Sequence, residues 1–511
     1  MESLRPLLAV CLPALAALGI FALAERPNAR EAVSVLASLG LLGVVASMVP
    51  AVLAGETFTL TLAPFVAGVP LALRADGLAL LFALLASLLW PVATIYSIGY
   101  VRALDESHQT RYFASFAASI AVTMGVAFAG NLLVLFVWYE LLTLATYPLV
   151  VHKGSAEAKR VGRRYVAFGL LGGTAVLAGC LLVYALAGSL AFTPGGIAAL
   201  TGADPLLVNT AFALLVGGFG VKAAVIPFYV WLPDAMVAPT PVSSLLHAVA
   251  VVKSGVFGLA RVVLFVFGPE LVRTLGLSGA LAALAAATTL LAALLAIRQE
   301  RFKRGLAYST VSQLSYIVLG VAVLVPDAVF GALLHIAAHA FMKLSLFFCA
   351  GIIYVETHVE YIKPLRGISR RLPLTAALFG VAAAGLVGFP LLAGFVSKWY
   401  LLVGLLGDGR LLLAGAVLVA SLLKLVFFWP IVTSVVFSEA TDAQRDRDPS
   451  TVGGPEPGKL WEHRTWRNET TWLLLGPLVA AVGFAVAFGV VPTELPFFGL
   501  AERVVTEVLG A

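Results

Sequence analysis

Apolar runs follow one another along the whole chain, separated by short polar stretches. Runs of about 20 residues span the hydrocarbon core of a bilayer as α-helices. The pattern therefore predicts an all-α polytopic membrane protein with about fourteen transmembrane helices. Their approximate limits are 5–24, 31–53, 76–98, 111–129, 131–151, 165–188, 207–236, 242–266, 276–297, 306–325, 327–355, 373–405, 411–436 and 470–491.

Two of these runs, 207–236 and 373–405, are too long for one span and contain Pro227 and Pro390. A proline inside a helix removes a backbone donor and clashes with the preceding turn, so it breaks or kinks the helix. At membrane depth such a break is tolerated only where the freed groups meet protein or water. We therefore expect the seventh and twelfth helices to be broken, and paired interrupted helices mark ion sites near the midplane of transporters.

Composition supports a membrane protein and offers no sign of a cofactor. Of the 511 residues, 61% are hydrophobic and 12% are charged, whereas soluble domains have about 25% charged residues. Cys11, Cys180 and Cys349 lie far apart in apolar runs, so they are interpreted as small hydrophobic residues. The sequence contains no flavin, iron–sulfur or nucleotide motif, and we expect no cofactor, no metal and no catalytic redox centre.

Basic residues are distributed unevenly between alternate loops. Loops that follow odd-numbered spans hold most of the 33 Lys and Arg residues, for example Lys153, Lys159, Arg160, Arg163, Arg164, Arg298, Arg301, Lys303, Arg304, Lys363, Arg366, Arg370 and Arg371. The other loops and the termini hold Arg5, Arg74, Arg273, Arg410 and Arg503. The positive-inside rule places the first set in the cytoplasm and both termini outside.

Two segments near the C-terminus are polar or amphipathic. Residues 437–469 are charged and rich in proline and glycine, which indicates either a mobile cytoplasmic loop or a docking surface for a partner. The stretch after the last span, 492–511, has helical apolar spacing and is expected to lie along the outer membrane interface.

Charged residues also occur inside the apolar runs. They are Glu140, Lys222, Lys253, Arg261, Lys343, Lys398 and Lys424. A base at mid-bilayer costs roughly 2.5–3.5 kcal/mol by insertion scales, so such groups are not scattered over a lipid face. They are expected to line a hydrated interior or to pair with one another, which points to charge movement across a membrane.

The two broken helices each carry one of these lysines. Lys222 lies just before Pro227, and Lys398 lies eight residues after Pro390. Burial pulls a lysine pKa towards neutrality, so a buried ammonium beside a hydrated break suits a proton carrier. The alternative is that these side chains snorkel to the membrane surface. Glu140 is the expected partner of Lys222, and opening of that ion pair would act as a switch.

Histidines accompany the lysines in the eighth and eleventh helices. His247 and Lys253 are six residues apart and do not share a helix face, so Lys253 is predicted to be the interior group and His247 either a relay or a core histidine. His335, His339 and Lys343 are spaced i, i+4 and i+8 on one stripe. No carboxylate or cysteine lies nearby to complete a metal site, so a proton relay is favoured over zinc or haem.

The last two bases have less defined roles. Lys424 lies mid-span in ASLLKLVFFWP and is interpreted either as the last relay or as an outward gate. Arg261, two turns beyond Lys253, approaches the outer surface and is interpreted as an anchor there.

These residues and motifs resemble the proton-antiporter module shared by complex I, the Mrp cation/proton antiporters and membrane-bound hydrogenases. The resemblance covers nearly the whole chain and includes RFKRGLAYSTVSQLSY at the start of the tenth helix. It implies that a proton-translocation axis is formed by Glu140 in VWYELL, Lys222 in VKAAVIPFYVWLPDA, Lys253, His335, His339 and Lys398. His247, Lys343 and Lys424 are possible further relays.

The resemblance also implies an organisation into two inverted five-helix repeats. Residues 1–110 would hold the first three helices, 111–266 the first repeat and 267–436 the second repeat. The loop 437–469 and the segment 470–511, with the fourteenth helix and the amphipathic tail, would follow.

Lysine at position 398 and an end soon after the last span are similar to the D-type subunit of Mrp antiporters, whereas His247 is similar to the A-type subunit and to the largest complex I type. The implied function is a proton-translocating, antiporter-like subunit of a monovalent cation/proton antiporter in the cell membrane. The alternatives are a proton-pumping subunit of a complex I-like NADH-quinone oxidoreductase or membrane-bound hydrogenase, and a stand-alone solute/proton carrier. Expected partners are other hydrophobic subunits, protons, lipids and, in the antiporter, sodium, with no nucleic acid.

Overall fold

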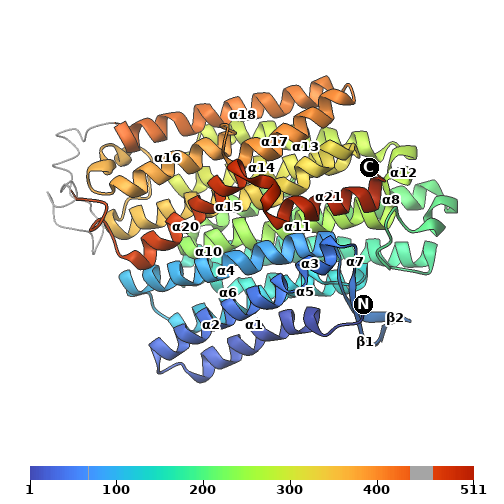
Figure 1. Ribbon diagram of the computed structural model, residues 1–511, viewed down its shortest axis with the longest axis horizontal. Helices are drawn as coiled ribbons and strands as arrows, with labels where there is room; N and C mark the ends of the chain where they lie inside the picture. The colour runs from blue at the N-terminus through green and yellow to red at the C-terminus, as the bar shows by residue number, and fades with distance from the viewer. Residues whose placement is uncertain (67, 438–463, 511) are drawn as a thin grey trace.

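Long helices pack side by side into one elongated bundle in the computed structural model, which describes residues 1–66, 68–437 and 464–510 (Figure 1). Among these residues, twelve helices are long and apolar enough to cross a membrane. The predicted class, an all-α multi-pass membrane protein, is confirmed.

The first half of the chain supplies eleven helices, some of them short. Their bounds are α1 Arg5–Ala22, α2 Pro27–Ala46, α3 Val49–Leu53, α4 Gly77–Ala103, α5 Gln109–Ala127, α6 Leu132–Val150, α7 Ala156–Ala187, α8 Pro205–Lys222, α9 Trp231–Asp234, α10 Thr240–Ser244 and α11 Val251–Arg261. Wider π-helical turns at Leu245–Val249 and Val262–Phe267 continue α10 and α11, so one span runs over Thr240–Phe267.

The second half continues the bundle. Its helices are α12 Pro269–Thr274, α13 Leu277–Ile297, α14 Phe302–Val323, α15 Pro326–Thr357, α16 Pro373–Val387, α17 Ala393–Gly407, α18 Leu411–Val432, α20 Trp472–Val490 and α21 Pro496–Leu509. The amphipathic α21 contacts α4 and α15 through buried residues such as Leu500 and Val504. Its apolar face therefore packs against the bundle.

Both predicted helix breaks are present. The seventh predicted span is α8, which ends at Lys222, followed by a short 3-10 turn from Phe228 and by α9. Pro227 lies between the two pieces. The twelfth predicted span is divided into α16 and α17, and Pro390 lies in the connection between them.

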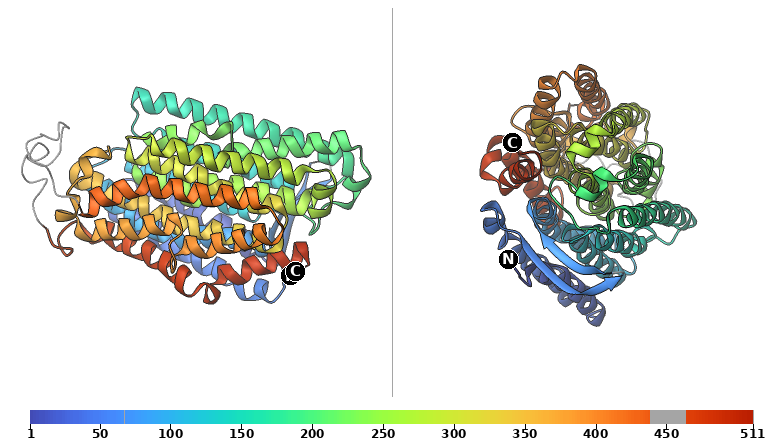
Figure 2. Two further views of the ribbon diagram at one scale, coloured as in Figure 1. Left: turned by 90° about the horizontal axis from the view of Figure 1, so that it is seen from above. Right: turned by 90° about the vertical axis from the view of Figure 1, so that its right-hand side faces the viewer.

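A β-hairpin that the hydropathy pattern did not predict precedes α4. Strands β1 (Phe58–Val66) and β2 (Val69–Ala75) pair antiparallel, with Phe58 opposite Ala75. Figure 2 shows the two strands, in blue, lying across the end of the bundle. The hairpin brings Arg74 and Asp76 to this end, where both chain termini also lie (Figure 1).

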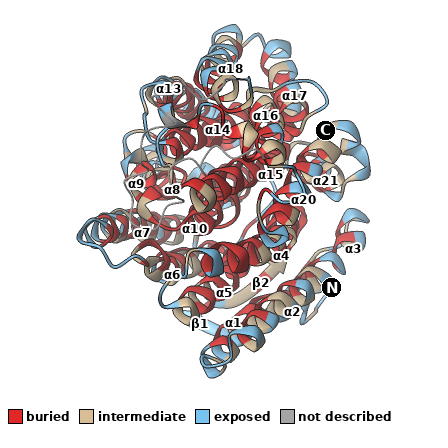
Figure 3. Ribbon diagram, turned by 90° about the vertical axis from the view of Figure 1, so that its left-hand side faces the viewer, coloured by how far each residue is buried: buried red, intermediate tan, exposed pale blue. Residues whose placement is uncertain are grey.

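Burial separates an inner set of helices from an outer set. In the most apolar stretch of each span, all residues of Thr240–Phe267, α14 and α15 are buried. The corresponding shares for α1 and for the span that contains α18 are 39% and 33%. Figure 3 shows α10, α14 and α15 in red near the middle of the bundle. Charged groups on these inner helices are therefore held away from lipid.

Candidate ion-translocation site

Lys222 is buried at the first helix break. Lys222 is the last residue of α8 and is 2% exposed. Its Nζ donates a hydrogen bond to the main-chain oxygen of Tyr139 on α6. The ammonium also lies 3.6 Å from the centre of the Tyr139 ring. An ammonium over an aromatic face is stabilised by the ring quadrupole. Snorkelling of Lys222 to the membrane surface is therefore excluded.

Glu140 follows Tyr139 on α6 and packs against α7. A Cβ atom added to Gly173 would lie 2.0 Å from Glu140 Oε1, so only glycine leaves space for the carboxylate. Among the described residues, no ion pair joins Glu140 to Lys222, and Glu140 Oε1 has no hydrogen-bond partner. The expected direct pair is not formed, because Tyr139 supplies the contacts that hold the ammonium.

Lys253 and His339 meet in the middle of the bundle. Lys253 Nζ, on α11, lies 3.0 Å from His339 Nδ1 on α15, and both side chains are fully buried. The rings of His339 and His335, one turn apart on α15, have their centres 6.0 Å apart. Residues from α11 and α15 thus form a continuous polar contact.

His335 connects this pair to the second helix break. Its Nδ1 lies 2.8 Å from Ser397 Oγ on α17, and its Nε2 lies 2.7 Å from Gln313 Oε1 on α14. Gln313 Nε2 donates to the main-chain oxygen of Leu386 at 2.9 Å. Lys398 donates to the same oxygen at 2.7 Å. His335 and Lys398 are therefore linked through one amide side chain and one carbonyl.

The carbonyl groups freed at the second break hold the Lys398 ammonium. Lys398 Nζ donates to the oxygens of Leu386 and Val387, at 2.7 and 2.6 Å, where α16 ends. The side chain is only 5% exposed. This arrangement satisfies the buried ammonium with the backbone oxygens that the interrupted helix leaves unpaired, and it excludes snorkelling.

Tyr316 brings Lys424 into the same network. Lys424 Nζ donates to the Tyr316 hydroxyl at 2.6 Å and lies 3.9 Å from the ring centre. The same ring lies 5.6 Å from Lys398 Nζ and 5.7 Å from the His335 ring. Lys424, on α18, is fully buried and lies at the far end of this series of polar groups.

Lys343 and His247 are two further buried ionisable groups on the inner helices. Lys343 follows His339 by one turn on α15, and its Nζ donates to Leu306 O at 2.7 Å and to Ser309 Oγ. His247 is fully buried, with its ring 4.9 Å from that of Phe347. Neither ring nitrogen of His247 has a hydrogen-bond partner among the described residues. His247 is therefore a core residue, but the described residues do not satisfy its ring nitrogens as they would those of a purely structural core histidine.

Sequence reasoning missed four residues that bridge the charged groups. Tyr139, Gln313, Tyr316 and Ser397 each contact a lysine or histidine of the network. Gln313 and Tyr316 are polar positions of a fully buried helix, one turn apart within RFKRGLAYSTVSQLSY. Their shared helix face is the signal that could have identified them.

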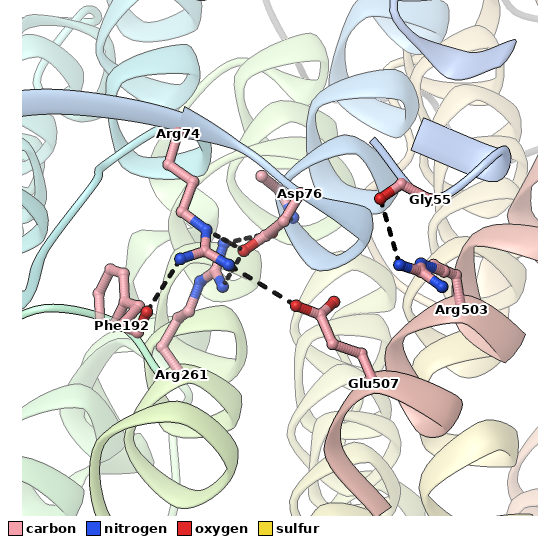
Figure 4. A network of polar contacts seen from close by, with 8 residues as sticks. Gly55, Arg74, Asp76, Phe192, Arg261, Arg503 and Glu507 are labelled. Carbon is pink, nitrogen blue, oxygen red and sulfur yellow. Dashed lines mark hydrogen bonds and ion pairs between the residues drawn. The ribbon is translucent and has the colours of Figure 1, made fainter. Parts of the chain in front are cut away.

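Arg261 is not an anchor at the outer surface. It is fully buried and makes a bidentate ion pair with Asp76, at 2.8 Å from Nη1 and 2.7 Å from Nη2 (Figure 4). Arg74 donates to the same carboxylate at 3.0 Å and lies 3.6 Å from Glu507 of α21. The pairing explains the error, because the acidic partner comes from a distant loop before α4.

The environment of Asp76 favours its charged form. Burial alone would raise the pKa of this carboxyl, but the charges of Arg261 and Arg74, with hydrogen bonds from Arg261 and the Ala79 N–H, lower it from 3.8 to about 2. Asp76 also caps the N-terminus of α4 by accepting a hydrogen bond from Ala79 N. One side chain thus joins the start of α4 to the end of α11.

This geometry defines a class of protein. It is a multi-pass helical membrane protein with a buried series of ionisable groups between two interrupted helices. The family described as NADH:quinone oxidoreductase/Mrp antiporter, TM, matches residues 129–424. The chain belongs to this family, whose members here are antiporter-like subunits of Mrp-like and complex I-like membrane complexes.

Individual relatives come from both kinds of complex. The chain is 33% identical over 405 residues to NADH-quinone oxidoreductase subunit N of Desulforudis audaxviator, covering 77% of each protein. It is 34% identical over 350 residues to the A-type subunit of the Na(+)/H(+) antiporter of Alkalihalophilus pseudofirmus, a match that covers 65% of this chain and 42% of that protein.

The fold is similar to that of subunits in solved membrane complexes. A chain of the Mrp complex from Dietzia sp. superposes with a TM-score of 0.84 and 25% identity, covering 99% of this chain and 98% of that one. A chain of an archaeal membrane-bound sulfane sulfur reductase gives a TM-score of 0.82 at 23% identity, covering 99% and 98%, which shows likeness of fold alone.

Proposed function

We propose that this chain translocates protons as the antiporter-like, D-type subunit of an Mrp-like monovalent cation/proton antiporter in the cell membrane. The observation that supports it is a series of contacts. Lys253 contacts His339, His335 contacts Gln313, and Gln313 and Lys398 both donate to the main-chain oxygen of Leu386. Each contact is within hydrogen-bonding distance except the step between the two histidine rings, whose centres are 6.0 Å apart. Side chains that exchange protons need this proximity.

In the proposed mechanism, protons enter from one side through the first repeat and leave through the second. Glu140 of α6 and Lys222 of α8 form the first station, and Tyr139, which precedes Glu140 on α6, accepts a hydrogen bond from Lys222. Movement of the Lys222 ammonium towards Glu140 would form the ion pair, and its return to the Tyr139 carbonyl would break it. Loops after odd-numbered spans face the cytoplasm, and other hydrophobic subunits complete the complex.

The second candidate is a proton-pumping membrane-arm subunit driven by an electron-transfer partner. The relative that favours it is the NADH-quinone oxidoreductase subunit from Desulforudis audaxviator, because the match covers 77% of both proteins. The structural likeness over 99% of the chain to a subunit of the Mrp complex favours the antiporter. The two functions differ in the energy source rather than in the axis.

The decisive variant is Lys222→Ala, with Arg298→Ala as a control that removes an exposed base outside the axis. Membrane vesicles containing the complete complex are monitored with a pH-sensitive dye after addition of Na⁺ or K⁺, and separately after addition of an electron donor and quinone. We expect Lys222→Ala to abolish coupled proton movement while the complex still assembles on native gels, and Arg298→Ala to retain it. Normal coupled transport by the Lys222→Ala complex would refute the axis.

A further inference from the structure

A basic cavity lies apart from the axis, where α5 begins, α6 ends and α7 begins. Its volume is about 310 Å³, and the basic side chains that line it are His108, Arg111, His152, Lys153 and Lys159. No acidic side chain is among its lining residues in the part of the chain that the structure describes. A concentration of positive charge around a partly open cavity favours an anion.

Two inner groups of this cavity have unused hydrogen-bonding capacity. Arg111 Nη2 donates to the main-chain oxygen of His152 at 3.2 Å, but Arg111 Nε has no partner among the described residues. His152 is 2% exposed, and its ring nitrogens make no hydrogen bond of normal geometry among the described residues, although the main chain of Ser107 lies close enough to favour the protonated ring. The nearest carboxylate oxygen, on Glu106, is 3.8 Å from His152 Nε2, which is too long for a hydrogen bond.

The charge state of His152 agrees with a positive environment. Burial, followed by the charges of Arg111, His108 and Lys153, lowers the pKa of His152 to about 4. The imidazole is therefore neutral at neutral pH and presents one ring N–H as a donor.

Helix ends add to the same field. α5 begins at Gln109 and α7 at Ala156, so two helix N-termini flank the cavity; that of α7 is capped by Ser155 and has Glu157 in its first turn, so the field comes from the start of α5. The residue before α5, His108, makes no side-chain cap, which leaves the first N–H groups of this helix without that partner. Phosphate groups bind at such helix N-termini.

The lining of the cavity indicates the source of the phosphate. Tyr147 of α6 and Val151, directly after this helix, form part of its wall. On the same helix, Leu144 and Leu141, three and six residues before Tyr147, are 58% and 38% exposed. Residues three apart on a helix are neighbours, so Leu144 lies beside Tyr147 and Leu141 beside Leu144. Exposed apolar surface suited to acyl chains therefore lies next to the basic cavity. Both loops that border it follow odd-numbered spans, on the side where anionic lipids are enriched if the proposed orientation holds.

We propose that this cavity binds the phosphate of an anionic phospholipid, whose acyl chains lie against the exposed leucines of α6. Arg111 and His152 form the inner contacts with the phosphate oxygens, and Lys153 and Lys159 close the cavity on its outer side. The site contains no member of the proton axis, so it stands or fails independently of the proposed transport function.

The test uses the purified full-length chain in an uncharged detergent and measures its thermal unfolding. Dioleoylphosphatidylglycerol, dioleoylphosphatidylcholine and inorganic phosphate are titrated separately at equal phosphate concentrations. We expect only the phosphatidylglycerol to raise the melting temperature, in a saturable way. Equal stabilisation by phosphatidylcholine would assign the effect to acyl chains alone, and equal stabilisation by inorganic phosphate would assign it to a soluble anion. Either result overturns the proposal.

The binding residues are tested by two variants and one matched control. Lys153→Gln/Lys159→Gln changes only exposed side chains and is expected to fold, and Arg111→Gln removes the inner base. Each base near an anionic lipid contributes a factor of about five, so the double variant should weaken the apparent affinity about twenty-fivefold. Arg298→Gln removes an exposed base elsewhere and should not weaken it. Unchanged affinity in both test variants would overturn the location of the site.

Discussion

Replacement of Asp76 by asparagine should destabilise the protein more than the loss of any exposed ion pair. Asparagine keeps a side-chain oxygen for the N-terminus of α4, so the variant isolates the charge. Asp76 and Arg261 are 1% and 0% exposed. In Asp76→Asn the guanidinium of Arg261 would stay buried without a neutralising partner.

The magnitude follows from the geometry in two ways. The fall of the Asp76 pKa from 3.8 to about 2 corresponds to roughly 2.5 kcal/mol in favour of the charged carboxylate in the folded state. Removal of one member of a buried ion pair costs about 3–5 kcal/mol, because the other charge is left uncompensated. We therefore expect Asp76→Asn to lower the free energy of unfolding by about 3 kcal/mol.

The assay is reversible unfolding in mixed micelles of an uncharged and an anionic detergent, followed by tryptophan fluorescence. Asp408→Asn is the matched control. Asp408 pairs with Arg410 at 2.8 Å, but the two side chains are 40% and 39% exposed. Exposed pairs contribute about 0.2–1 kcal/mol. A loss below about 1 kcal/mol in Asp76→Asn, equal to that of the control, would refute a stabilising role for the buried pair.

The pH dependence supplies an independent check. Because the folded-state pKa of Asp76 is lowered, its stabilisation is complete above the ordinary value of 3.8 and is lost as the pH falls towards about 2. The difference in unfolding free energy between wild type and Asp76→Asn should therefore shrink over this range. A difference that does not change between these pH values would contradict the assignment.

Two further substitutions test the axis itself. Gly173→Ala would place a Cβ atom 2.0 Å from Glu140 Oε1 and displace the carboxylate. Coupled transport should therefore fall at least about tenfold. The control Gly415→Ala, which has no atom within 4 Å of its added Cβ, should transport normally. Equal rates in the two vesicle preparations would contradict a role for the carboxylate position. Tyr316→Phe removes the oxygen that accepts a hydrogen bond from Lys424 Nζ at 2.6 Å. The free energy of unfolding in the micelle assay should fall by about 1–3 kcal/mol. A loss smaller than about 0.5 kcal/mol would show that Lys424 finds another partner.

The parts of the architecture that depend on local chemistry could be predicted from the sequence. Proline ends a helix through its own missing donor and its own ring, so Pro227 and Pro390 located both breaks. Bases inside apolar runs have to be buried in protein because lipid does not solvate them. This reasoning placed Lys222, Lys253 and Lys398 in the interior, where the structure has them.

Features that depend on long-range contacts could not be predicted in this way. Arg261 differs from an interfacial anchor only through Asp76, which belongs to a loop far away in the sequence. The contact of Lys222 with Tyr139 rather than with Glu140 depends on side-chain rotamers and on a ring that composition does not distinguish from a packing residue. Neutral bridging groups such as Gln313 cost much less free energy to bury in a membrane than charged groups do. A hydropathy pattern therefore does not single them out.

The hairpin shows a third kind of difficulty. The segment between the second and third predicted spans alternates threonine and leucine only over Thr59–Leu62, which is a short signal for a strand. Its pairing is completed by β2 and by the N-terminal residues, since Ser3 N donates to Thr59 O at 3.2 Å. A strand that depends on distant partners is weakly encoded by its own residues.

The ion cluster of Arg74, Asp76 and Arg261 also bears on the order in which the chain is made. The ribosome makes α4 before α11, so Asp76 at the start of α4 lacks its Arg261 partner until several more helices have been synthesised. Glu507 arrives later still, with α21. The ion cluster is therefore complete only after α21 has been made, so the charges of the first spans are neutralised by the last helix described.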